Sequence, residues 1–223
     1  MADARVGSDA DMVPRRTVDG RVPGRRGLAT RNRLLDATHG LISEIAYRDL
    51  TVIEISRRAG TSPATFYQYF PDIESAVLVL AAEVADTGGR RLRALVDEAD
   101  WSDRADATAL VSGFVDFFDE ERALLRVVDL AALEGDERFR ALRTRLLNGV
   151  FLSLHDVAYE ARARDAISPD SDPGAVAGVL TSMLAHVSAH RPGLEAWGVA
   201  SEDLIATMAA VVDWSVRGAA PEA

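Results

Sequence analysis

The chain has 223 residues, 48% of them hydrophobic, a formal net charge of −10 and no cysteine. This composition supports a packed core, and it excludes a disulfide framework, a thiol nucleophile and thiolate metal sites. There is no apolar run of about 18 residues and no apolar N-terminal signal segment, so we expect a cytoplasmic protein that does not enter a membrane.

Charge is unevenly distributed along the chain. All 25 basic residues are arginine. Residues 1–70 hold 11 arginines against 8 acidic residues, whereas residues 71–223 hold 14 against 27. A mildly basic first part and an acidic remainder fit a DNA-binding head on a body that phosphate repels. Random variation of a solvated surface is the alternative that charge alone leaves open.

The first 26 residues are rich in Gly, Asp, Pro and Arg and show no periodicity, which predicts disorder. One interpretation is an arm that follows DNA phosphates or enters a minor groove. The other is a solvated extension without function, or a start site assigned too early. Arg15, Arg16, Arg21, Arg25 and Arg26 are spaced along the second half of this segment.

A first helix is predicted from about Leu28 to Ile45, and residues 51–70 then predict two short helices joined by a glycine turn. Thr51 and Glu54 form a capping box, in which each side chain bonds the other residue's amide. Gly60 stands where a left-handed residue ends a helix. The apolar stripe of the first helix is Leu34, Thr38, Leu41, Ile42 and Ile45.

The second short helix begins with a Ser62 cap and Pro63 at its first position. Phe66 and Phe70 are four residues apart and so share one face, which we expect to be buried. The outward side chains suit DNA, because glutamine can bond adenine twice and hydroxyls suit phosphates. An ordinary helical hairpin is the alternative. The predicted DNA-binding residues are Thr51, Ser62, Ala64, Thr65, Tyr67, Gln68 and Tyr69.

This pattern resembles the tetracycline-repressor (TetR) family of transcriptional regulators over about residues 28–84. Family members usually carry a lysine near the start of the fourth helix, where it meets a phosphate, and Ile73 stands there in this chain. The residues that carry the resemblance are Ala37, Leu41, Ile42, Tyr47, Leu50, Thr51, Val52, Ile55, Ala59, Gly60, Ser62 and 65–70.

The remainder of the chain shows helical periodicity and no strand pattern. The predicted fold is therefore all-α, with a three-helix helix-turn-helix domain at 27–71, preceded by the arm at 1–26. A helical effector-binding and dimerisation domain is predicted at 72–223. Its helices are expected at about 73–98, 103–119, 120–133, 136–164, 175–190 and 201–217, with Arg191, Pro192 and Gly193 ending the fifth of these and Ser201 capping the last.

Aromatic residues cluster on the inner faces of these helices, with histidines and a methionine nearby at helical spacing. A plain hydrophobic core is one interpretation. The family resemblance implies the other, a pocket for a small apolar or aromatic effector. The predicted pocket residues are Phe114, Phe117, Phe118, Phe151, His155, Tyr159, Met183 and His186.

The last two helices combine small residues with an apolar stripe. The resemblance implies that they pair with a second copy to form a homodimer, and packing within one chain is the alternative. A twofold dimer presents two recognition helices to a pseudo-palindromic operator. The predicted interface residues are Ala177, Gly178, Thr181, Ala185, Leu204, Met208, Val211 and Val212.

The sequence thus predicts a ligand-responsive DNA-binding regulator, in most family members a repressor released by its effector. The alternative is a helical protein-interaction module whose head binds a protein partner. The chain has no HExxH motif, phosphate-binding loop or nucleophile elbow. We therefore expect no enzyme, catalytic residue, metal site or cofactor.

Overall fold

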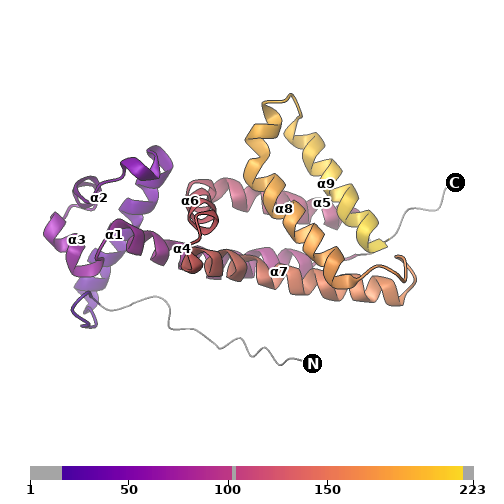
Figure 1. Ribbon diagram of the computed structural model, residues 1–223, viewed down its shortest axis with the longest axis horizontal. Coiled ribbons are helices and arrows are strands. Elements are labelled where there is room, and N and C mark those ends of the chain that lie inside the picture. The colour runs from indigo at the N-terminus through magenta and orange to yellow at the C-terminus, as the bar shows by residue number, and fades with distance from the viewer. Residues whose placement is uncertain (1–16, 102–103, 218–223) are drawn as a thin grey trace. The chain divides into compact units, whose positions relative to one another are not determined.

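The structure, a computed structural model, describes residues 17–101 and 104–217 (Figure 1). All regular secondary structure in these ranges is helical, which confirms the all-α prediction. None of the described helices is long and apolar enough to cross a bilayer. The helices are α1 (Arg25–Glu44), the 3₁₀ turn η1 (Tyr47–Asp49), α2 (Val52–Arg58), α3 (Pro63–Tyr69), α4 (Ile73–Asp97), α5 (Arg104–Glu120), α6 (Arg122–Leu133), α7 (Glu137–Ala163), α8 (Pro173–Glu195) and α9 (Ser201–Arg217).

The chain divides into two compact units, the first ending at Glu83 and the second beginning at Val84. The predicted domain boundary at residue 72 precedes this division, because the first half of α4 belongs to the first unit. Ala76 and Val77 in that half are fully buried. Helix α4 itself continues without a break across the division.

In the first unit, α1 packs against α2 and α2 against α3. Leu34, Ile55 and Phe66, one from each helix, are 0% exposed and form the centre of this core. Helix α1 begins at Arg25 with Gly24 as its N-cap, earlier than the predicted Leu28. The extra turn is polar and carries no apolar periodicity, so the hydrophobic pattern could not reveal it.

The core of the second unit is built around α5, which packs against α8 and α9, while α7 packs against α6 and α8. Phe114, Leu154 and Leu184 are 0% exposed. The ring of Phe117 on α5 packs directly against the backbone of α4 at Gly88. A Cβ atom on Gly88 would lie 2.3 Å from the Cζ atom of Phe117, so a larger residue here would require this buried ring to shift.

Helix α8 extends to Glu195 and contains Pro192, whereas the sequence predicted that Arg191, Pro192 and Gly193 would end it. The half-buried side chain of Arg191 makes contacts in this last turn. It donates to Asp119 of α5 and, at 2.6 Å, to Glu195 one turn further on. Ser201 was expected to cap α9 but is its first residue, and its hydroxyl donates to Glu195 at 2.6 Å.

Asp136 caps α7 at the position where the sequence predicted this helix to start. Its carboxylate accepts from the amide of Arg138 at 2.9 Å. The Arg138 guanidinium lowers the pKa of Asp136 from 3.8 to about 2. A carboxyl whose pKa is lower in the folded than in the unfolded protein stabilises the fold at pH values above the unfolded-state pKa. This stabilisation is lost as the pH falls through the folded-state pKa. We therefore expect Asp136→Ala to cost about 1 kcal/mol in free energy of unfolding at pH 7. Urea unfolding should show this difference from wild type disappearing between pH 4 and pH 2; a difference independent of pH would contradict it.

Candidate nucleic-acid interface and effector site

The two short helices α2 and α3 are capped largely as the sequence predicts. The amide of Glu54 donates to the hydroxyl of Thr51 at 3.2 Å, and the amide of Thr65 donates to the hydroxyl of Ser62 at 3.2 Å. Gly60 adopts φ +65° in the turn between the helices. One half of the capping box differs from expectation, because the Glu54 carboxylate accepts from the Thr51 hydroxyl at 2.8 Å rather than from the Thr51 amide.

Helix α3 has one buried and one exposed face. Phe66 and Phe70 are 0% and 2% exposed, and their ring centroids lie 5.5 Å apart. On the other face Ala64 and Gln68 are exposed and Tyr67 is 52% exposed, whereas Thr65 and Tyr69 are half-buried. The rings of Tyr67 and Phe66 meet edge to face, with their centroids 5.7 Å apart and their planes at 89°.

The hydroxyls of the predicted DNA-binding set differ in what they already bond. Those of Thr51 and Ser62 serve as helix caps, and the Ser62 hydroxyl also bonds that of Thr65 at 3.0 Å. Their expected phosphate contacts therefore compete with bonds inside the chain. Gln68 and Tyr67 project their polar groups from the exposed face of α3, which makes them the stronger candidates for direct contact with DNA.

Two arginines outside the predicted site connect elements of this unit. Arg58 at the end of α2 bonds Glu44 of α1 through two contacts of 2.6 Å, which lower the pKa of the Glu44 carboxyl. Arg31 is only 5% exposed, and its guanidinium lies 5.4 Å from the centre of the Phe70 ring. Its position three residues before Leu34 puts it on the apolar stripe of α1, the signal that could have revealed it.

The start of α4 is acidic where the family resemblance led us to expect a lysine. Ile73 is half-buried, and Asp72 accepts from the amide of Ser75 at 2.7 Å. Burial, with Glu74 and Asp72 nearby, raises the pKa of the Tyr47 hydroxyl.

The structure separates the predicted pocket residues into two groups. Phe114, Phe117 and Phe118 are buried on α5, with Phe114 stacked on Phe118 at 6.4 Å. The other five lie on α7 and α8 and are more exposed. Phe151, His155 and Met183 are half-buried, His186 is exposed, and Tyr159 is 56% exposed.

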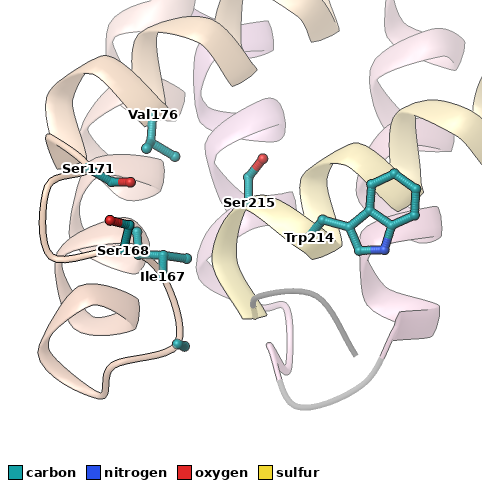
Figure 2. A pocket seen from close by; sticks show the side chains of 7 residues that line it. Ile167, Ser168, Ser171, Val176, Trp214 and Ser215 are labelled. Atoms are coloured by element: carbon teal, nitrogen blue, oxygen red, sulfur yellow. The ribbon is translucent and has the colours of Figure 1, made fainter. Parts of the chain in front are cut away.

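Two open hollows lie on the surface of the second unit. One of about 370 Å³ is lined by the loop after α7, the first turn of α8 and the end of α9 (Figure 2). Figure 2 shows Ser168, Ser171 and Val176 on one side of it and Ser215 with Trp214 on the other. The second, of about 320 Å³, is lined by Arg143, Thr144, Leu147, Asn148 and Phe151. Phe151 is the predicted pocket residue that lines one of these hollows.

Five of the eight residues predicted for the dimer interface are buried within one chain. Small side chains at these positions let α8 approach its neighbours in the same chain closely, the alternative that the sequence left open. Gly178, Leu204 and Val211 are half-buried. The five buried residues are Ala177, Thr181, Ala185, Met208 and Val212, at 0–7% exposure.

Comparison with known proteins agrees with this architecture. Residues 34–80 match the family model for bacterial regulatory proteins of the tetR family. Residues 92–223 match the model for a tetracyclin repressor-like C-terminal domain. An uncharacterized HTH-type transcriptional regulator of Haemophilus influenzae is 36% identical over 52% of this chain and 55% of its own length. BetI of Klebsiella pneumoniae is 35% identical over 30% of this chain and 36% of its own.

The chain thus spans about half or less of the length of these two curated relatives. Among solved structures, FadR of Bacillus subtilis in complex with stearoyl-CoA has a TM-score of 0.62 at 19% identity, covering 85% of this chain and 99% of its own. Reduced NemR of E. coli has a TM-score of 0.63 at 18% identity, covering 86% and 100%. These two share the fold, and the family models together cover both units. The chain therefore belongs to the TetR family of transcriptional regulators.

Proposed function

We propose that the chain is a repressor that binds a pseudo-palindromic operator as a homodimer and is released by a small apolar effector. The observation that carries the proposal is the exposed face of α3. Seven residues long, this helix buries Phe66 and leaves Ala64, Tyr67 and Gln68 exposed. Glutamine can form two hydrogen bonds with adenine, and a tyrosine hydroxyl can donate to a phosphate.

Gln68 is the residue that we expect to read a base. Gln68→Ala should relax sequence preference at one operator position by about 1–3 kcal/mol. Tyr67→Phe is the matched control, because it removes a hydroxyl without removing the ring and should weaken all sites alike. Binding selections with the two variants measure this, and an unchanged preference for the Gln68 variant would remove its base-reading role.

The outward face of α8 is the face that we propose for dimerisation. Val179 is 66% exposed, and Ser182 and His186 follow it on the same side of the helix and are also exposed. On α9, Trp214 is 56% exposed. Aromatic side chains such as this tryptophan are enriched where protein partners meet. Two copies joined here would present two α3 helices to two half-sites.

An acyl chain is the effector class to test first. The predicted pocket residues are mainly aromatic, and the Bacillus subtilis FadR was solved with stearoyl-CoA. The FadR of Thermus thermophilus, with a TM-score of 0.53, was solved with lauroyl-CoA. An effector that prefers the state with low affinity for DNA shifts the population towards that state. The affinity for the operator then falls by the factor that couples the two sites. A repressor acting in this way works where the DNA is, in the cytoplasm.

Selection of bound sequences from a random duplex library, at physiological salt, tests the proposal. We expect an enriched inverted repeat and a steep loss of affinity with added salt. Acyl-CoA should then release the selected operator. Absence of enrichment from a folded protein would favour the alternative in which the head binds a protein partner.

A further inference from the structure

Residues 17–26 lie against the recognition helix rather than apart from it. The amide of Val18 donates to the carbonyl oxygen of Gln68 at 2.9 Å, which joins the segment to the last turn of α3. A turn precedes Arg21, with the amide and hydroxyl of Thr17 both donating to the Arg21 carbonyl at 2.9 and 3.0 Å. The described part of the predicted arm thus has a defined position beside the residue expected to read bases.

A second contact fixes the point where this segment becomes α1. A Cβ atom on Gly27 would lie 2.9 Å from the Cβ of Pro23 and 3.3 Å from the hydroxyl oxygen of Tyr69. The first turn of α1 is therefore in close contact with the last turn of α3. Arg25 and Arg26, both exposed, stand within two residues of that contact.

The charges of this segment favour an external anion. It holds three arginines and one acidic residue, Asp19, which pairs with Arg21 at 3.5 Å. Within the part of the chain that the structure describes, neither Arg25 nor Arg26 forms an ion pair. Arginine in the first turn of a helix is unfavourable for the helix dipole, so this pair does not serve the stability of α1.

We propose that residues 17–26 form a second DNA-contacting element, in which Arg25 and Arg26 bind phosphates flanking the bases that α3 reads. The bond from Val18 to Gln68 positions the segment. The inference rests on the proposed operator binding and extends the contact area beyond the helix-turn-helix. Contacts to phosphate strengthen binding and set register without adding sequence preference.

Neutralising the two arginines tests the charge. Arg25→Ala with Arg26→Ala should weaken binding to all duplexes alike and reduce the slope of log affinity against log salt by about 2. Hydroxyl-radical footprinting should show protection lost only at the flanks. Arg126→Ala with Arg140→Ala is the matched control, since both arginines are exposed in the second unit and should leave the slope unchanged.

Removing the Val18 donor tests the position. Val18→Pro deletes the amide hydrogen without changing charge and should lose the flanking protection, whereas Val18→Ala keeps the donor and should behave as wild type. Wild-type affinity, slope and footprint in both the arginine and the proline variants would overturn the inference. Failure of the wild type to bind any duplex would instead refute the proposed function itself.

Discussion

Replacing Phe66 with alanine is expected to lower the free energy of unfolding of the first unit by about 3–5 kcal/mol and to abolish operator binding. Phe66 is 0% exposed and contacts Phe70 and Tyr67 through its ring. A seven-residue helix is far too short to persist in water by itself, so α3 depends on this burial. The loss is comparable with the whole stability of a small domain.

Urea unfolding and operator affinity, measured on the same preparations, check this expectation. Tyr67→Ala is the control, because Tyr67 is 52% exposed and surface substitutions usually change stability by about 0.5 kcal/mol or less. It should reduce affinity while leaving the unfolding curve nearly unchanged. If Phe66→Ala retained both stability and affinity, α3 would not be held by its buried face.

Phe114→Ala separates the two interpretations of the aromatic residues in the second unit. Phe114 is 0% exposed and is stacked on Phe118, which is 5% exposed. If the ring belongs to the core, its loss should cost about 3–5 kcal/mol in free energy of unfolding. We expect this outcome, measured by urea denaturation of the full chain.

Tyr159→Ala is the comparison for that experiment, because Tyr159 is 56% exposed and belongs to the same predicted pocket set. It should leave stability almost unchanged. If Phe114→Ala lowered the free energy of unfolding by less than about 1 kcal/mol, and the variant was no longer released from its operator by an acyl effector, Phe114 would instead belong to the pocket lining.

The helix-turn-helix was predictable because its signals are local. Thr51, Gly60, Ser62 and Pro63 each act within a few residues, and the spacing of Phe66 and Phe70 alone identifies the buried face of α3. The structure confirms the N-cap bonds to Thr51 and Ser62, the left-handed glycine and the buried pair. The start of α1 escaped prediction because its first turn buries no apolar residue.

In the second unit the helices could be predicted, but not the neighbours that their faces meet. A stripe such as Ala177, Thr181 and Ala185 has the same spacing whether it contacts its own chain or a second copy. The last turn of α8, which contains Pro192, includes a bond from Arg191 to Asp119, and this partner is distant in sequence. The fit of Gly88 against Phe117 likewise depends on a tertiary contact that no local pattern encodes.

The inward position of the small residues on α8 has a consequence for how such a protein diverges after gene duplication. Ala177, Thr181 and Ala185 maintain the core, so substitutions there risk unfolding the chain. Val179, on the outward side, is 66% exposed and can change without that penalty. If this side joins two copies as proposed, duplicated genes could lose the ability to form mixed pairs through a few surface changes, while each product kept its fold.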